Sequence, residues 1–379
     1  MAEHVFFEQS QKMFRFLRIW SSYRKTNKNK FDILLNSWVI IFCGSFIGII
    51  SLIDAIQAIQ MDQIDVKFTK LLFLCVVLVV IHKVCTVTYN QKIIVEFIEQ
   101  LQKLSSTFEN KTNFYNAHKL YKKIFFFGIY SMNISVFVFM VAPAVLFQNK
   151  KLFFQPKISF LNLQESPTWE LMFVFQSISA FIFTNITFGY DTVYCGIMIT
   201  SAAILKSIAR EIREVDGVIE DHQISEQKLK NIIEKIIEIS GVTKNISDIF
   251  AMTTMVHIVY VCGTMALGLY VMSIQPLNDL TCFSMLLATI MSIFLLWIYC
   301  YFGQTLVDQR RMLQTELYFL KWYEAQRSQK IMILVTISVL QRDCFVYAGK
   351  IIPLSMETFG QVLLKAYTFF TFMNDIKYK

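Results

Sequence analysis

Five polar side chains interrupt the last apolar stretch of the sequence, residues 351–373, at intervals of three or four positions. They are Glu357, Gln361, Lys365, Thr368 and Thr371. In a helix this spacing gathers them on one broad stripe, while apolar residues cover the other sides. A stripe that carries charges is costly to expose to lipid, so it must meet protein or water. The sequence therefore predicts a helix that borders a water-filled pore.

The rest of the chain has the composition of a membrane protein that holds such a helix. Hydrophobic residues make up 55% of the 379 residues and charged residues only 17%, against about 25% in soluble domains. The mean hydropathy is +0.48. The net charge of +8 is explained by Lys and Arg on cytoplasmic loops, so we expect no nucleic-acid partner.

Seven apolar segments are long enough to cross a bilayer core of about 30 Å. They cover residues 33–53, 69–88, 124–147, 169–205, 249–272, 281–303 and 351–373. With the N-terminus inside, 27 of the 36 Lys and Arg residues fall in cytoplasmic segments and seven in external ones. The fold class is therefore an all-α polytopic membrane protein with seven transmembrane helices, a cytoplasmic N-terminus and an extracellular C-terminus.

Helical periodicity continues beyond the apolar segments on the cytoplasmic side. Ile, Leu and Val recur every three or four residues over 203–244, with a break at 217–225, and again over 304–330. A further apolar stretch at 330–341 is too short to span. These patterns predict a cytoplasmic helical anchor layer whose apolar faces are buried between subunits.

These patterns divide the chain into five parts. Residues 1–31 form a basic cytoplasmic segment with a short interfacial helix, and residues 32–303 hold six transmembrane helices with their cytoplasmic extensions. Residues 304–350 are the anchor helices, 351–373 the pore-lining helix and 374–379 an extracellular tail.

Isolated polar residues within the apolar segments are expected to have structural roles. We expect Asp191 to partner a Tyr, a Thr or a backbone group, and His82, Lys83 and His257 to be solvated or capped near helix ends. The eight cysteines show no CxxC or Cys/His spacing, so no metal site or cofactor is expected. No Ser/His/Asp set, HExxH or Gly-rich phosphate loop indicates a catalytic residue, so we predict that the chain is not an enzyme.

The fourth apolar segment resembles the corresponding region of insect odorant receptors. Ser166 and Pro167 stand at its outer end, Gln176 further in, Asp191 deeper, and small residues at 201–203 toward the cytoplasm. The C-terminal run is similar too, from Pro353-Leu354-Ser355 through Phe359 to LKAYTFF at 364–370, although Ala366 stands where Ser is more typical. The chain is shorter than the shared co-receptor, Orco, and lacks its long insertion between the fourth and fifth segments. It therefore resembles an odorant-tuned subunit.

The resemblance implies a tetrameric, ligand-gated, non-selective cation channel in the plasma membrane of olfactory sensory neurons. Each subunit would contribute its last helix to a central pore, and the cytoplasmic helices would join the subunits. A volatile odorant would bind in the outer half of each helix bundle. The implied partners are the co-receptor in a hetero-oligomer, a small volatile ligand, permeating cations and membrane lipid.

Two sets of candidate site residues follow. For the pore, we expect Phe370, Met373 and Asn374 to form an apolar gate that closes by dewetting, and Lys365 to lie in a wider vestibule. The odorant-binding set lies in the outer halves of the second, third, fourth and sixth segments and is mostly aromatic, Met or aliphatic, with Gln176 as its polar group. It consists of Phe73, Cys75, Val76, Phe137, Met140, Val141, Met172, Phe173, Gln176, Phe283 and Met285.

Three other classes stay open at this point. A gustatory-type receptor channel shares the architecture, although its TYxxxxxQF ending is absent. A G-protein-coupled receptor has seven helices in the opposite orientation and carries a DRY-like triplet after the third one. A transporter more often shows inverted repeats or broken helices in paired positions.

Overall fold

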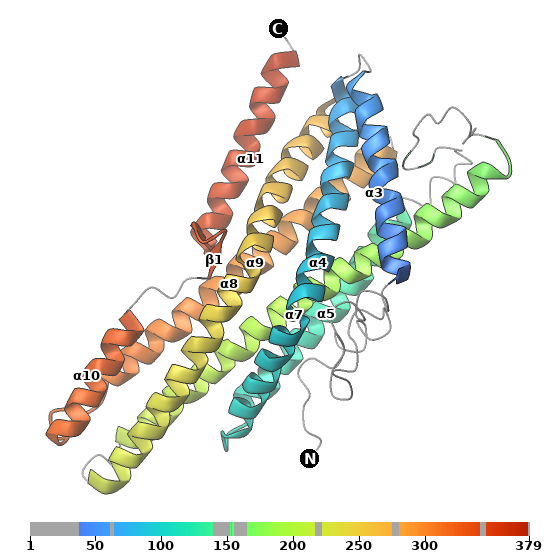
Figure 1. Cartoon of the computed structure of the whole chain (residues 1–379). Helices are drawn as coiled ribbons and strands as arrows, with labels where there is room; N and C mark the ends of the chain where they lie inside the picture. Colours follow the sequence, from blue (N-terminus) through green and yellow to red (C-terminus); the bar gives the residue numbers. More distant parts are fainter. Residues whose placement is uncertain are drawn as a thin grey trace.

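The computed structural model describes residues 38–60, 64–138, 152, 154, 165–216, 222–274, 280–341 and 346–377. Within these ranges the long helices form one elongated bundle, and the last helix stands at its edge (Figure 1). The elements are α3 (Trp38–Ile59), α4 (Ile64–Ser106), α5 (Thr112–Val136), α7 (Thr168–Asp216), α8 (His222–Ile274), α9 (Leu280–Phe319), α10 (Arg327–Gln341), β1 (Tyr347–Ala348), β2 (Ile352–Pro353) and α11 (Met356–Lys377).

Each of the seven predicted apolar segments falls on a helix, in the order α3, α4, α5, α7, α8, α9 and α11. Residues 33–37 and 139–147 of the predicted segments, like the basic N-terminal segment, lie outside the described residues. In the described part of the chain, α4, α7, α8 and α9 contain stretches long and apolar enough to cross a membrane. The chain is thus an all-helical polytopic membrane protein. Seven crossings and the orientation of the chain stay predictions.

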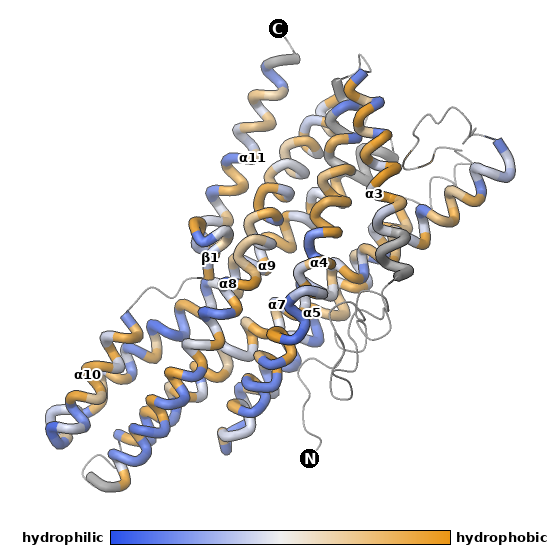
Figure 2. The backbone as a smooth tube through the Cα atoms, in the orientation of Figure 1, coloured by the Kyte–Doolittle hydropathy of each residue, from blue (hydrophilic) through white to orange (hydrophobic). Residues whose placement is uncertain are grey.

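Helices α7, α8 and α9 extend well beyond their apolar segments, as the periodicity predicted. Figure 2 shows hydrophobic residues concentrated at one end of the bundle and hydrophilic ones around α10 and the neighbouring helix ends. We call these the apolar end and the polar end. At the polar end, an Arg213–Glu316 ion pair joins α7 to α9, and Lys235 Nζ lies 2.8 Å from Glu211 Oε1, which joins α8 to α7. The hydrogen bond that Arg213 donates to Glu316 lowers the pKa of the Glu316 carboxyl.

Helix α9 ends earlier than its periodicity suggested. The pattern predicted a helix to residue 330, but α9 stops at Phe319 and α10 starts at Arg327. Because the chain turns back here, Ile333 and Leu340 of α10 are buried, and the Arg310 guanidinium of α9 donates to the carbonyl of Val339 at 3.0 Å. A continuous helix would leave this apolar face of α10 without a partner. Tyr323, which falls within the range 304–330 predicted to be helical, lies in the turn and is exposed.

Helix α11 begins at Met356, not at Ile351 as the sequence suggested. The residues before it form an antiparallel two-stranded ladder, in which Tyr347 is paired with Pro353 and Ala348 with Ile352. The hydroxyl of Ser355 then accepts a hydrogen bond from the Thr358 amide at 3.2 Å, as an N-cap residue does. The hairpin and this cap fix where the helix starts.

The hairpin positions α11 against α8 and α9. In its turn, Gly349 has a φ of +60° and its amide donates to the Ala251 carbonyl of α8 at 2.7 Å. On the other side, Gly303 of α9 lies so close to Leu354 that a Cβ there would stand 2.5 Å from the Leu354 carbonyl oxygen. The approach of α11 to α9 therefore depends on the absence of a side chain at residue 303.

We expect Gly303→Ala to destabilise the protein by about 1–3 kcal/mol, because the new methyl group must displace backbone atoms. The measurement is the melting temperature of the purified, detergent-solubilised chain. Gly241→Ala is the matched control, since a Cβ at that helical position meets nothing within 4 Å. Equal melting temperatures for the two variants would contradict the conclusion that the approach of α11 to α9 requires a glycine at residue 303.

Candidate functional site

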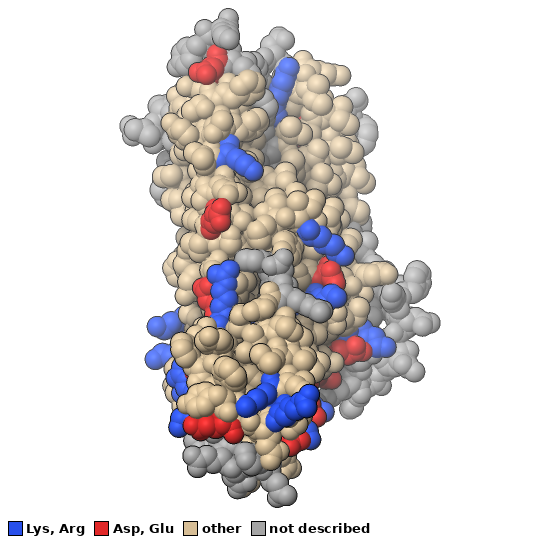
Figure 3. Space-filling model, turned by 90° about the vertical axis from the view of Figure 1, so that its left-hand side faces the viewer, with Lys and Arg blue, Asp and Glu red and all other residues tan. Residues whose placement is uncertain are grey.

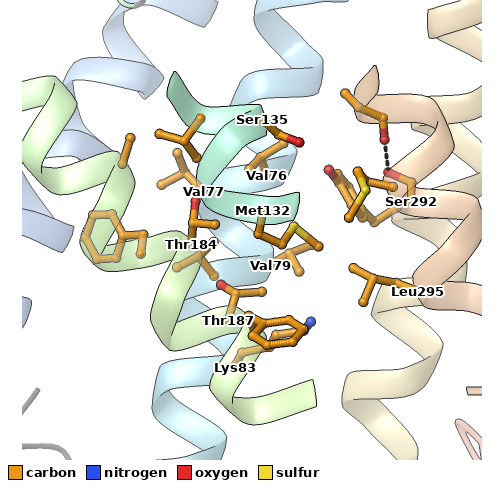
Figure 4. Close-up of a pocket in the computed structure, with 18 of the residues that line it drawn as sticks. Val76, Val77, Val79, Lys83, Met132, Ser135, Thr184, Thr187, Ser292 and Leu295 are labelled. Carbon is orange, nitrogen blue, oxygen red and sulfur yellow. Dashed lines mark hydrogen bonds between the residues drawn. The ribbon is translucent and has the colours of Figure 1, made fainter. Parts of the chain in front are cut away.

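The apolar end of the bundle encloses a cavity of about 300 Å³, a size typical of the smaller ligand pockets. Residues of α3, α4, α5, α7, α8 and α9 line it, together with Phe154. Figure 4 shows Met132 of α5 reaching into its middle, with Val76 above and Leu295 on the far wall. Most of the lining is aliphatic or aromatic, so the cavity suits a small apolar molecule.

Gln176 closes the cavity at the side away from the polar end. Its side-chain amide is buried and donates to the Phe154 carbonyl at 3.1 Å, while its carbonyl oxygen accepts from the Phe154 amide at 3.2 Å. Phe154 packs in turn against Ile47 and Ile50 of α3. Both ends of the Gln176 amide thus hold the backbone of Phe154 over the cavity.

A buried ion pair forms the floor of the cavity, the side nearer the polar end. Lys83 Nζ of α4 lies 2.7 Å and 2.9 Å from the two carboxylate oxygens of Asp191 on α7. The Tyr299 hydroxyl of α9 donates to the same carboxylate at 2.5 Å. The expected Tyr partner of Asp191 is confirmed. The expectation that Lys83 is solvated or capped is wrong, because its side chain is buried against Asp191.

His257 of α8 completes this floor. It is 2% exposed and lines the cavity, and neither ring nitrogen has a hydrogen-bond partner among the residues that the structure describes. Its ring packs against those of Tyr299 and Tyr260, with centroids 5.2 Å and 6.1 Å away. His257 was expected to be solvated or capped near a helix end, and in the structure it is neither. His82 differs, since its Nε2 lies 3.2 Å from the Thr253 hydroxyl.

The structure places the predicted odorant-binding residues at different depths. Val76 and Gln176 line the cavity. Cys75, Phe137, Met172 and Phe173 are described but do not line it. Met140 and Val141 lie outside the described residues, and Phe73, Phe283 and Met285 fall on helices at positions whose side chains are not described.

Most of the cavity lining was not in the predicted set. The lining includes Met132, Thr187, Phe188, Tyr260 and Met291, which the sequence argument did not select. The signal that could have found them is the pair of opposite charges, one on α4 and one on α7, because two such groups inside apolar segments must meet. Their meeting point marks the depth of the floor.

The last helix presents its polar residues away from its own bundle. We define the α11 stripe as Glu357, Gln361, Lys365 and Thr368, all of which are exposed. The opposite face packs on α8 and α9. Figure 3 views the molecule from the side on which α11 lies and shows only scattered charged residues over its upper part, with many more at the lower end. A charged stripe at this depth needs water or other subunits around it.

The predicted gate residues lie near the far end of α11. Met373 is buried with Leu267 and Tyr270 of α8, and Phe370 packs against the same cluster. Asn374 is half-buried. Tyr260 also packs against this cluster and lines the cavity. One side chain of α8 therefore touches both the cavity and the group of residues that holds the end of α11.

A family model for the 7tm Odorant receptor matches residues 63–367. The chain belongs to the odorant receptor family. This confirms the resemblance inferred from the fourth and last segments, and it places the chain among receptors, not enzymes. The gustatory-type, G-protein-coupled and transporter alternatives are set aside.

Two comparisons add detail. Odorant receptor 2a of Drosophila melanogaster is 29% identical over 147 residues, and the alignment covers 38% of this chain and 34% of that relative, about a third of its length. The olfactory receptor OR5 of Machilis hrabei has a similar fold, with a TM-score of 0.81 at 14% identity over 97% of this chain and 96% of that one. Its structure in complex with eugenol gives 0.80 at 13% identity over 98% and 97%.

The Lys83–Asp191 pair gives a direct test of the floor. Asp191→Asn and Lys83→Met each leave one buried charge without its partner, and each should cost about 3–5 kcal/mol of stability. The double variant Lys83→Met with Asp191→Asn has no charge to bury and should recover much of that loss. Thermal unfolding in detergent measures all three. Additive losses in the double variant would mean that the two groups do not depend on each other.

Proposed function

We propose that this receptor is the odorant-binding subunit of a ligand-gated, non-selective cation channel. The observation that carries the proposal is the mainly apolar cavity of about 300 Å³, enclosed by six helices of an odorant receptor fold. An apolar volatile molecule gains dispersion contacts and loses its hydration on entering such a space. The complex of a similarly folded receptor with eugenol supports a small ligand of this kind.

The odorant contacts come from the cavity lining. Val76 and Gln176 stay in the proposed binding set, joined by Met132, Phe188 and Met291. The two methionines come from different helices, and their flexible thioether side chains let one cavity fit ligands of different shapes.

The pore is formed where the last helices of several subunits meet. The exposed α11 stripe supports this, since its charged and amide groups need water on the side away from α8 and α9. We propose that the stripe borders the pore and that Phe370, Met373 and Asn374 form its narrow end. Because Phe370 and Met373 contact α8 in the single chain, the gate and the bundle move together.

Tyr260 is the proposed link between ligand and gate. It lines the cavity on one side and packs on the other against the cluster that contains Met373 and Phe370. A ligand that displaces the Tyr260 ring changes the packing of that cluster. The free energy by which binding favours the open state then equals the difference in the ligand's binding free energy between the two positions of the ring.

The partners and location of the receptor follow from the same argument. We propose a heterotetramer with the co-receptor Orco in the plasma membrane of olfactory sensory neurons, with the polar end in the cytoplasm. The excess of Lys and Arg in the segments assigned to that side supports the orientation. Tyr318, Phe319 and Leu334 are large apolar residues exposed near the α9–α10 turn, and they suit contacts between subunits.

Filling the cavity tests the ligand site. In cells that express this chain with the co-receptor, we expect Val76→Phe to abolish or strongly weaken cation currents evoked by a panel of volatile odorants, because the added ring occupies the cavity. Val174→Phe is the matched control, since Val174 is exposed and does not line the cavity. Surface labelling confirms that both variants reach the membrane. Normal responses in Val76→Phe would place the ligand elsewhere.

Charge removal tests the pore. A unit charge at about 8 Å in water contributes about 0.5 kcal/mol, roughly twofold in local cation concentration. We therefore expect Lys365→Met to raise the single-channel cation conductance up to about twofold and Glu357→Gln to lower it. Lys350→Met is the control, because Lys350 is outside α11 and pairs with Asp248. Unchanged conductance in both α11 variants would remove the stripe from the ion path.

A further inference from the structure

Two side chains on the cavity floor have hydrogen-bonding atoms without partners in the described part of the chain. They are His257, at both Nδ1 and Nε2, and Thr187, at its hydroxyl oxygen. Both line the cavity. Figure 4 places Thr187 low in the cavity beside Lys83. Buried polar atoms are almost always paired, so unpaired atoms on side chains that line a cavity point to a partner supplied by a ligand.

Several other polar groups of the lining already have hydrogen-bond partners. The Ser292 hydroxyl donates to the Ala288 carbonyl at 2.8 Å, and the Ser135 hydroxyl donates to the Ser131 carbonyl at 2.8 Å. Gln176 is held by the backbone of Phe154. Among the described lining residues, the buried atoms without a partner are therefore all on the floor, between α7 and α8, and the walls above it offer mainly apolar contacts.

We infer that His257 and Thr187 form a hydrogen-bonding subsite for an oxygen atom of an uncharged ligand. The inference rests on the proposed function, because it assumes that the cavity is the odorant site. A neutral imidazole offers one donor and one acceptor, and a hydroxyl offers both. Together they can pair with the oxygen of an alcohol, a phenol, a ketone or an aldehyde whose apolar body fills the space above.

The charges around the subsite explain why the ligand is uncharged. Lys83 faces the cavity from α4, but its ammonium is already neutralised by Asp191, which also accepts from Tyr299. A carboxylate ligand would have to compete with Asp191 for Lys83. An ammonium ligand would add a second positive charge beside Lys83 and find its carboxylate already occupied. For neither charged ligand would the contacts in the cavity offset the hydration energy that it loses on entering the bundle.

The test compares pairs of probes in which a methyl group replaces a hydroxyl group. Suitable pairs are 1-octanol with nonane, 4-methylphenol with p-xylene, and cyclohexanol with methylcyclohexane; octanoic acid is the charged probe. Binding to the full-length purified receptor is measured by ligand-induced thermal stabilisation, and currents are measured with the co-receptor. For pairs that bind, we expect His257→Phe and Thr187→Val each to reduce the affinity ratio of oxygenated to hydrocarbon probe by roughly tenfold.

Met291→Leu is the control variant, since it changes an apolar wall and should alter both members of a pair alike. Ratios that stay unchanged in folded His257→Phe and Thr187→Val would overturn the subsite, as would octanoic acid binding more tightly than 1-octanol. If His257→Phe does not fold, Thr187→Val decides, because the hydroxyl it removes has no partner among the described residues. If no probe binds the wild-type receptor, the proposed odorant site itself fails, and the subsite with it.

Discussion

The ion pair between Lys83 and Asp191 is the constraint on which the apolar end depends. Neither charge can be left alone inside a helix bundle that crosses a membrane, so α4 and α7 must meet at this level, and the Tyr299 hydroxyl brings α9 to the same point. Above the pair the helices are apolar and diverge enough to leave the cavity. Below it they pack tightly, around side chains such as Tyr194 and Ile208, which are fully buried. The pair therefore sets where the cavity ends.

Helix α8 connects the parts of the molecule that the proposed mechanism needs. Successive turns of this helix carry the Ala251 carbonyl that holds the hairpin before α11, His257 and Tyr260 at the cavity, and Leu267 and Tyr270 against the end of α11. Because these residues lie on one helix, the proposed mechanism can transmit a change at the cavity to both ends of α11. The helix can do this because its apolar residues cover more than one face, so that it packs against the bundle and against α11 together.

The last helix is incomplete in a single chain. It is held on one side by α8 and α9, while its charged stripe and several large apolar residues, such as Tyr367 and Phe372, remain exposed. Lipid is a poor environment for the first group, and this mixed surface supports the proposed assembly, in which subunits leave water along the stripe. The exposed aromatic residues near the α9–α10 turn raise the same requirement at the polar end. Both surfaces thus support the proposed assembly of subunits.

The sequence by itself determined the helices and the family, because helical periodicity, apolar length and the runs around Gln176 and Tyr367 are local patterns. It also determined that Asp191 needed a partner, and it set the polar stripe of α11 apart. The tertiary structure alone decided that the partner was Lys83, that α10 turned back on α9, and that α11 started at the Ser355 cap. The depth of the cavity was decided in the same way, since it depends on how the charges of α4 and α7 meet across more than one hundred residues of chain. A one-dimensional pattern shows which faces must be covered, whereas the identity of the covering residue depends on packing between distant helices.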